Sequence, residues 1–316
     1  MSIGIVLCFF TGCPAERPRT HAINTVQSVA STGAPVSFAQ VVRTGQEPLP
    51  VPDGVISQTF ASDEYIFFKE NLWNLAAAKL DVDNLVFLDS DVFFKDHQWL
   101  ENTERTLNEF DFVQPFSMCH WLSKSGEIEM SRPDSCTAIL QGLHPKGGDY
   151  HPGFGMAMTK RLYDYMGGVW DGGVCGGGGD GANVFAHSRS AGTDKYLAKL
   201  ADRKHFSGMT MEDHRRFFYS PSWKTYRQRS MDYGVRVGHV PNQDVYHRWH
   251  GERHKRRYTT RAEFFNWPAD GHPPVRYRQD GLQEWTIPQP RAADYFYGRD
   301  EDGENPVKAS RYIPVD

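Results

Sequence analysis

The segment DNLVFLDSDVFF, residues 83–94, places two aspartates directly after a run of four apolar residues. A continuously apolar strand is typical of a parallel sheet covered on both faces, because a half-exposed strand alternates apolar and polar residues. Acids that follow such a strand lie at the carboxyl edge of the sheet, where open α/β folds bind their ligands. The segment therefore predicts an α/β fold with Asp89 and Asp91 at a ligand site.

The first ninety residues support this fold, because apolar strand-like runs alternate with helical ones. Residues 3–10 and 36–42 predict strands, with a helix between them. Residues 62–80, SDEYIFFKENLWNLAAAKL, predict a second helix with Ser62 or Asp63 as its N-cap. Strands that alternate with helices predict a mostly parallel central sheet flanked by helices.

A length of 316 residues suits one large domain with an appendage. We expect a domain over residues 1–265 and a C-terminal extension over residues 266–316 that packs on the same domain. Five prolines precede Arg291 in this extension, which is typical of an extended arm.

The five cysteines follow no metal-ligand spacing, and no segment has the ~20 apolar residues of a membrane span. These observations predict a cytoplasmic protein with reduced cysteines. The alternative, a short signal peptide that ends at Cys13, lacks a positively charged start.

Asp89 and Asp91 can project to the same side once the strand turns into a loop. Together they would form a hard oxygen site for Mg²⁺ or Mn²⁺, and such a cation commonly holds a phosphate or diphosphate. The alternative is an aspartate that caps the turn after the strand. The preceding helix, the buried strand and the position at the sheet edge favour the cation site.

A second motif, VYHRWHGERHKRRY, places His247 and His250 three residues apart and a glycine after them. Five lysines or arginines lie between Arg248 and Arg257. An imidazole can complete the coordination of a transition metal, and the basic side chains suit a diphosphate. Either histidine by itself would more often be a surface or core residue.

A third motif is a Gly-rich stretch in which Asp180 follows four glycines. Glycines permit close approach of a ligand to the backbone, so Asp180 is a candidate general base for an acceptor hydroxyl. It can also cap a helix that begins near Ala182, and the two roles do not exclude each other. The motifs GxGxxG at the first helix, GxxxxGK[ST] and GxSxG are missing, which argues against dinucleotide oxidoreductases, P-loop enzymes and serine hydrolases.

These motifs together resemble the nucleotide-sugar glycosyltransferases of the GT-A fold. Residues 67–94 are similar to that family's helix and Asp-x-Asp strand, and residues 151–180 are similar to its Gly-rich second half. The pattern H-x-W-H-G followed by R-x-Y, residues 247–258, is most similar to a little-characterised group of bacterial and phage proteins. The tail segment YFYGRDEDGEN, residues 295–305, is similar to the tail of the same group.

The resemblance implies metal-dependent transfer of a sugar from a nucleoside diphosphate-sugar, with a UDP-sugar favoured, to an acceptor hydroxyl. It implies Mn²⁺ or Mg²⁺ as cofactor and Asp91 as its most direct ligand. Asp89 would act through metal-bound water or the ribose, His250 would be a further ligand, and His247 would be its substitute. Asp180 as base implies inversion at the anomeric carbon, although better-known galactosyltransferase-like members carry two adjacent acids there.

Further residues are assigned by the same resemblance. The donor-binding set is Arg43, Asn74, Ser90, Arg253, Lys255 and Arg256. The acceptor-binding set is Trp170, Asp171, Gly178, Gly179 and Trp249. Alternatives stay open for two of them, because Trp170 can equally be a packed aromatic and Arg43 a solvated surface residue.

Charge distribution bears on the acceptor. Residues 199–261 carry 15 Lys and Arg against six Asp and Glu, a net +9 in a chain of net −4. A basic surface can follow a DNA backbone, and Trp223, Tyr226 and Trp249 could stack on a flipped base. We therefore expect a 5-hydroxymethylpyrimidine in phage DNA as the acceptor. A solvated basic face, a cell-surface glycan or lipid-linked acceptor, and a noncatalytic nucleotide-sugar- or DNA-binding protein are the alternatives.

Overall fold

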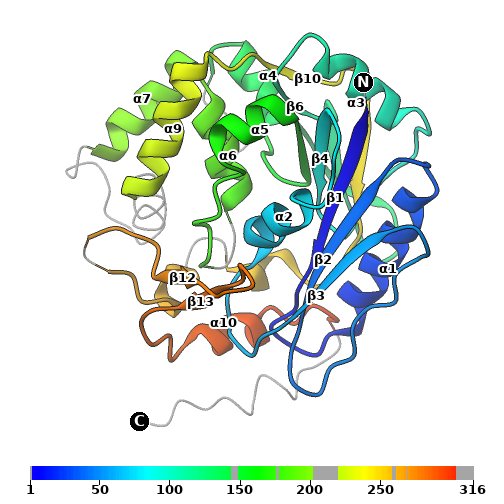
Figure 1. Cartoon of the computed structure of the whole chain (residues 1–316), viewed down its shortest axis with the longest axis vertical. Helices are drawn as coiled ribbons and strands as arrows, with labels where there is room; N and C mark the ends of the chain where they lie inside the picture. Colours follow the sequence, from blue (N-terminus) through cyan, green and yellow to red (C-terminus); the bar gives the residue numbers. More distant parts are fainter. Residues whose placement is uncertain are drawn as a thin grey trace.

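The computed structural model describes residues 2–143, 149–175, 178–201, 220–257, 261–268 and 270–303. Its main sheet consists of β1 (Ile3–Phe9), β2 (Val36–Val42), β3 (Ile56–Ala61), β4 (Asn84–Leu88), β6 (Phe112–Gln114), β9 (Gly155–Thr159) and β10 (Val237–His239). The strand order is β10-β6-β9-β4-β1-β2-β3 (Figure 1). Only β9 runs antiparallel to its neighbours, and the other pairs are parallel. The predicted fold class, a mostly parallel sheet flanked by helices, is confirmed.

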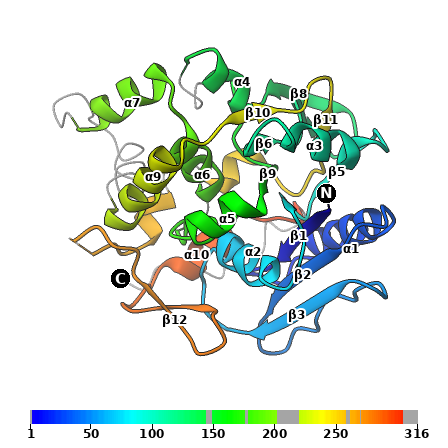
Figure 2. The ribbon, with the colours of Figure 1, turned by 45° about the horizontal axis from the view of Figure 1, so that its top comes forward.

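The first strand is apolar throughout because its two sides contribute to two different cores. Ile5, Leu7 and Phe9 pack in the core that also contains α1 (Glu16–Ala30) and α3 (Trp99–Leu107). Val6 and Cys8 face the opposite core, which contains α2 (Lys69–Ala77), α5 (Lys160–Met166), α6 (Gly179–His187) and α9 (Pro221–Tyr233). The helices thus cover both faces of the sheet, as Figure 2 shows for α1 and α2.

A second sheet has the order β5-β11-β7-β8. Its strands are β5 (Val92–Phe94), β11 (Asp244–His247), β7 (Met118–Leu122) and β8 (Ile128–Pro133). β5 begins immediately after Asp91, and it pairs antiparallel with β11 so that His247 lies opposite Val92. This pairing brings two motifs that are distant in sequence to one place.

The C-terminal segment contains β12 (Val275–Tyr277), β13 (Gln283–Trp285) and α10 (Ala292–Gly298) (Figure 1). Phe296 of α10 is buried in the same core as α2. Beyond it, the Asp302 carboxylate accepts backbone N–H hydrogen bonds from Glu16 at 3.1 Å and Arg17 at 2.8 Å. Since Ala15 offers no capping side chain, Asp302 supplies the acceptor for the first turn of α1.

Two details of the sequence prediction are corrected. The second helix begins at Lys69, not after Ser62 or Asp63. The Asp63 carboxylate instead accepts hydrogen bonds from the backbone N–H and the hydroxyl of Thr44, at 2.9 and 2.6 Å. An unpredicted strand, β3, lies at the edge of the main sheet, where most of its side chains are exposed.

Several sequence predictions fall on residues outside the described part of the chain. They concern Gly176 and Gly177 of the Gly-rich motif, residues 202–219 of the basic segment, Tyr258, and residues 304–316 of the tail. No helix among the described residues is both long and apolar enough to cross a membrane. All five cysteines are buried, and none forms a disulfide.

Candidate active site

A cavity of about 550 Å³ lies where β1 and β4 end. The chain passes from β1 to β2 on one side, and it later returns to place β4 on the other side of β1. Such a switch in strand order leaves a crevice at the carboxyl ends of the strands, which is the usual ligand site of open α/β sheets. Residues 8–12 and 89–91 line this cavity from the two strand ends.

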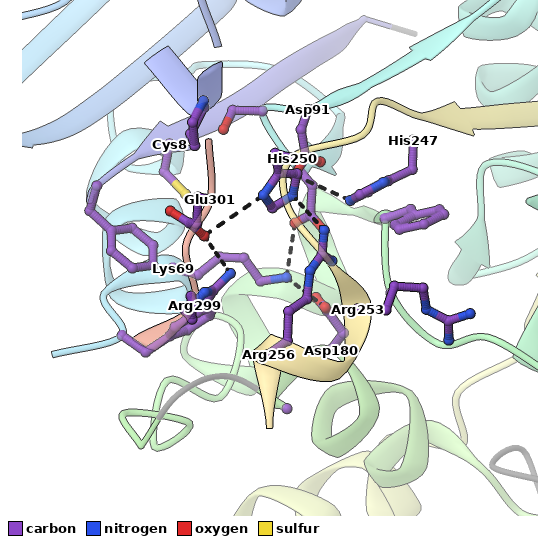
Figure 3. Close-up of a pocket in the computed structure, with 18 of the residues that line it drawn as sticks. Cys8, Lys69, Asp91, Asp180, His247, His250, Arg253, Arg256, Arg299 and Glu301 are labelled. Carbon is purple, nitrogen blue, oxygen red and sulfur yellow. Dashed lines mark hydrogen bonds and ion pairs between the residues drawn. The ribbon is translucent and has the colours of Figure 1, made fainter. Parts of the chain in front are cut away.

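Asp91, His247 and His250 form a group of potential metal ligands, with one ligand atom each and all three atoms within 4.8 Å of one another. Asp91 Oδ2 lies 2.8 Å from His250 Nε2 and 3.4 Å from His247 Nε2 (Figure 3). Two ligand atoms bound at about 2.1 Å from one ion are about 3.0–3.4 Å apart in octahedral or tetrahedral geometry. The spacing of the group therefore fits a divalent cation.

The electrostatic state of this group also suits a metal. Burial acts to raise the pKa of Asp91, but His247 and His250 outweigh it and hold that pKa well below its usual value. Burial, with Arg256 nearby, lowers the pKa of His250 well below its usual value, so this imidazole is neutral. Asp91 Oδ1 is buried without a hydrogen-bond partner in the part of the chain that the structure describes. An ionised carboxylate, a neutral imidazole and an unsatisfied oxygen are the states that metal binding requires.

Backbone geometry positions these ligands. The Asp91 carbonyl accepts a hydrogen bond from the Arg248 N–H at 2.9 Å, which joins the turn after β4 to the end of β11. Gly251, directly after His250, has a φ of +84°. A Cβ at this glycine would lie 2.6 Å from the Asp300 carbonyl oxygen, so a side chain there would displace the tail.

A second cluster in the same cavity has its own cation. Lys69 Nζ lies 2.9 Å from Asp89 Oδ1 and 2.5 Å from Asp180 Oδ2, and Figure 3 shows its contact with Asp180. Burial would lower the pKa of Lys69, but the two carboxylates hold it well above its usual value. Burial raises the pKa of Asp180 to about 6 despite Lys69. Asp89 and Asp91 thus belong to two different clusters, although a single residue separates them.

The helix-cap alternative for Asp180 is not what the structure shows. Gly178 is the N-cap of α6 and has no side chain to cap it, and Asp180 lies in the first turn of this helix. The Asp180 carboxylate points into the cavity toward Lys69 (Figure 3). It can therefore contact a molecule bound there.

Glu70 lies beneath the Gly-rich loop and is 1% exposed. Neither of its carboxylate oxygens has a hydrogen-bond partner in the described structure. Burial raises the pKa of Glu70 to about 8, so this acid is largely protonated at neutral pH. A Cβ at Gly179 would lie 2.1 Å from Glu70 Oε1, which explains why only glycine fits where the loop enters α6.

Arginines form the remaining charged wall of the cavity: Arg132, Arg253, Arg256, Arg261 and Arg299. Arg256 Nη2 lies 3.0 Å from His250 Nε2, and Arg299 Nη2 lies 2.7 Å from the Glu301 carboxylate. The guanidinium groups of Arg132 and Arg253 lie 5.9 and 5.3 Å from the centre of the Trp121 ring. Planar guanidinium groups are well suited to bind phosphate oxygens in pairs.

Nine of the residues predicted from the sequence line this cavity: Asp89, Ser90, Asp91, Gly178, Asp180, His247, His250, Arg253 and Arg256. Seven do not: Arg43, Asn74, Lys255, Trp170, Asp171, Gly179 and Trp249. The structure therefore brings together the metal and base candidates, and it leaves most of the assigned acceptor residues elsewhere.

The donor candidates outside the cavity have other partners. Arg43 donates to the Glu64 carbonyl and lies 4.0 Å from the centre of the Tyr65 ring. The Asn74 amide bonds both the N–H and the carbonyl of Val169, at 2.9 and 2.8 Å. Lys255 Nζ lies 2.5 Å from the Asp300 carboxylate.

The acceptor candidates outside the cavity are similarly engaged. Trp170 is 6% exposed and donates from Nε1 to the Ser222 hydroxyl. The Asp171 carboxylate accepts the Tyr277 hydroxyl proton at 2.9 Å, and the Trp249 ring contacts Arg17.

The stacking role predicted for two other aromatics is wrong. Trp223 and Tyr226 are buried in the core at 2% and 6% exposure. Neither ring is available to stack on a base.

Sequence reasoning missed several residues that line the cavity, among them Lys69, His151, Arg299 and Glu301. Lys69 and Glu70 gave a signal, because a charged pair interrupts the apolar run in YIFFKENLW. His151 opens the HPGFG segment. Glu301 lies in the tail segment that resembles the tail of the bacterial and phage group, but that resemblance assigned it no role, since its contact with the cavity depends on how the chain returns.

Comparisons with known proteins give only distant similarity. No family model matches the sequence, and no curated protein matches it. The structure of TarS residues 1–349 from S. aureus has a TM-score of 0.34 at 10% identity, covering 58% of this chain and 54% of that one. The catalytic domain of Drosophila beta1,4-galactosyltransferase 7, in complex with xylobiose, has a TM-score of 0.30 at 11% identity, covering 76% and 65%. The chain thus spans less than two thirds of either structure, and the geometry of its own site carries the functional argument.

Proposed function

We propose that this chain is a metal-dependent glycosyltransferase that moves a sugar from a nucleoside diphosphate-sugar to an acceptor hydroxyl. The observation that carries the proposal is the placement of Asp91, His247 and His250 within 4.8 Å of one another in an arginine-lined cavity. These three residues would hold Mn²⁺ or Mg²⁺, which when bound supplies Lewis-acid stabilisation of a departing diphosphate. The resemblance of the sequence motifs to GT-A enzymes points to the same chemistry.

The arginines would bind the donor. Arg253, Arg256, Arg261 and Arg299 line the same cavity as the metal candidates, so their N–H groups can reach phosphate oxygens there. Fixed donors of this kind stabilise charge that develops on a leaving group, because they are already oriented when the bond breaks. Ser90 lies between the two acids and can add a hydroxyl donor.

Asp180 would act as the general base. Its Oδ2 is held by Lys69 at 2.5 Å, while its Oδ1 is buried and meets no hydrogen-bond partner within the described ranges. A carboxylate whose pKa is raised to about 6 is still ionised at neutral pH, and it is a stronger base than an exposed aspartate. Removal of the acceptor proton by Asp180, with the hydroxyl oxygen attacking opposite the diphosphate, inverts the anomeric carbon.

We propose a 5-hydroxymethylpyrimidine in DNA as the acceptor. The support is the net +9 charge of residues 199–261, since a basic surface favours a polyanionic partner. A glycan or a lipid-linked acceptor is the competing class, and the experiment below separates the two.

The test incubates the protein with Mn²⁺, a panel of UDP- and GDP-sugars, and DNA that contains cytosine, 5-hydroxymethylcytosine or 5-hydroxymethyluracil. The DNA is digested, and the nucleosides are weighed by mass spectrometry. A sugar mass on a hydroxymethylated nucleoside, lost with EDTA and in Asp91→Asn, is the expected result. Donor turnover with unchanged nucleosides overturns the DNA acceptor, and donor binding without turnover favours a noncatalytic binding protein.

A further inference from the structure

We propose that Glu301, in the C-terminal tail, is a positioning residue that orients His250 for metal binding by accepting the proton on His250 Nδ1. The inference rests on the metal site of the proposed function. The proposal gives the C-terminal tail a role at the metal site. Glu301 follows His250 by 51 residues and lies near it only because of the fold.

The contacts of His250 show which ring nitrogen faces the proposed metal. Nε2 lies 2.8 Å from Asp91 Oδ2 and belongs to the group of three potential ligand atoms. Arg256 Nη2 lies 3.0 Å from the same nitrogen. A histidine that binds a metal through Nε2 carries its single remaining proton on Nδ1, so Nδ1 is the donor when the site is occupied.

The other side of the His250 ring faces the tail. His250 Nδ1 is buried and has no hydrogen-bond partner among the described residues. Glu301 Oε1 lies 3.7 Å from it, as the dashed line in Figure 3 marks. This distance is too long for a hydrogen bond and too short for a water between the atoms, but a side-chain shift of about 1 Å closes it.

Glu301 is the middle one of three consecutive acids in the tail, and each of them contacts another part of the chain. Asp300 pairs with Lys255 at 2.5 Å, and Asp302 caps the first turn of α1. Between them, the Glu301 carboxylate pairs with Arg299 at 2.7 Å and is only 13% exposed. Lys255 lies five residues after His250, so the ion pair with Asp300 fixes the tail beside the loop that carries His250.

Glu301 acts through His250 and not as a ligand. The group of ligand atoms within 4.8 Å contains Asp91, His247 and His250 without Glu301. A carboxylate behind a ligating histidine fixes its tautomer and raises its basicity, and loss of such a partner costs about 10–100-fold in metal affinity.

The test measures Mn²⁺ affinity by calorimetry, without donor or acceptor, for Glu301→Met, Glu301→Gln and Asp302→Asn. We expect Glu301→Met to bind Mn²⁺ about 10–100-fold more weakly. Glu301→Gln should recover part of this loss because its amide oxygen still accepts a proton. Asp302→Asn, which keeps a capping oxygen on the same tail, should match the wild type.

A second readout does not depend on how well a variant folds. In wild-type protein loaded with Mg²⁺, which is diamagnetic, ¹⁵N NMR of His250 should show the proton on Nδ1. A wild-type proton on Nε2, or Mn²⁺ affinity in folded Glu301→Met equal to wild type, overturns the role of Glu301 alone. A wild-type chain that binds no Mn²⁺ overturns the proposed metal site and this inference with it.

Discussion

The two clusters of charged residues in the cavity stabilise their buried carboxylates in different ways. On one side, Lys69 offsets part of the charge of Asp89 and Asp180 with a cation that belongs to the chain. On the other side, Asp91 faces the imidazoles of His247 and His250. The first cluster already contains a cation, whereas the second has the side chains to bind one from solution.

This difference sharpens the reading of the Asp-Ser-Asp motif. Two acids that flank one serine would conventionally be assigned to one metal. Here the chain turns between β4 and β5, so Asp89 contacts Lys69 while Asp91 contacts His250. The first two of the following predictions test whether the two clusters behave as differently as their partners suggest.

The largest effect on folding is expected from Lys69→Met. Removal of the ammonium leaves Asp89 and Asp180 buried without their cation, which should cost about 3–5 kcal/mol in the free energy of unfolding at pH 8. Urea denaturation measures this cost, and protonation of Asp180, whose pKa is raised to about 6, should shrink it at pH 5. Lys160→Met is the matched control, because its ion pair with Asp164 is exposed and should contribute under about 1 kcal/mol. Equal losses in the two variants would contradict the role of Lys69 as the cation of this cluster.

The second prediction separates the two acids by metal affinity. Asp91→Asn should weaken Mn²⁺ binding by at least about 100-fold, since loss of a direct ligand exceeds the effect of an outer partner. Asp89→Asn, whose carboxylate contacts Lys69, should stay within about threefold of the wild type on the same reasoning. Calorimetric titration with Mn²⁺ measures both, and comparable losses would place the two aspartates at one metal.

The third prediction concerns Glu70, the buried acid next to Lys69. Its pKa in the folded chain is about 8, above the ordinary 4.5, so folding favours the protonated form. Its contribution to stability is complete below the ordinary pKa and is lost as the pH rises through about 8. We expect Glu70→Gln to remove about 4 kcal/mol of the fall in unfolding free energy between pH 5 and 9.

Chemical denaturation across this pH range provides the measurement for Glu70. Glu101→Gln, on the exposed side of α3, serves as the control and should leave the pH profile unchanged. A wild-type free energy of unfolding that does not change between pH 5 and 9 would contradict the raised pKa of Glu70.

The smallest effect is expected from Asn74→Ala. The amide of Asn74 bonds both backbone groups of Val169, so its loss should cost about 1–2 kcal/mol of stability. The KM for the sugar donor should not change, because Asn74 lies outside the cavity. Arg256→Gln, inside the cavity, should instead raise that KM. A donor KM that rises in Asn74→Ala would restore the donor-binding role assigned from the sequence.

Much of the fold could be predicted from short segments of the sequence. The apolar run before Asp89 predicted a buried strand because a strand whose sheet is covered on both faces has consecutive apolar residues. The start of α2 was misplaced because Asp63 has the side chain of an N-cap, but its oxygens are taken by Thr44 of another loop. The edge strand β3 was missed because an exposed strand has no apolar pattern to detect.

Residues of the candidate site could be predicted from the sequence where the residue type alone indicates the role. They could not be predicted where the role depends on which distant residue the side chain contacts. Asp91 and His250 could be identified because aspartate and histidine are common metal ligands and each lies in a recognisable motif. Asn74 and Lys255 were assigned to the donor, yet they bond Val169 and Asp300, which lie 95 and 45 residues further along the chain. A single sequence does not show such pairings, and the same holds for Lys69 with Asp180.

The acid that caps the first helix has a consequence for how the molecule is made. Synthesis proceeds from the first residue, so α1 leaves the ribosome nearly three hundred residues before Asp302 can reach it. The loop with His250 is likewise complete before Glu301 has been added. The cavity is therefore finished only when the tail emerges, and a nascent chain stalled before residue 300 would carry the ligands without their final support.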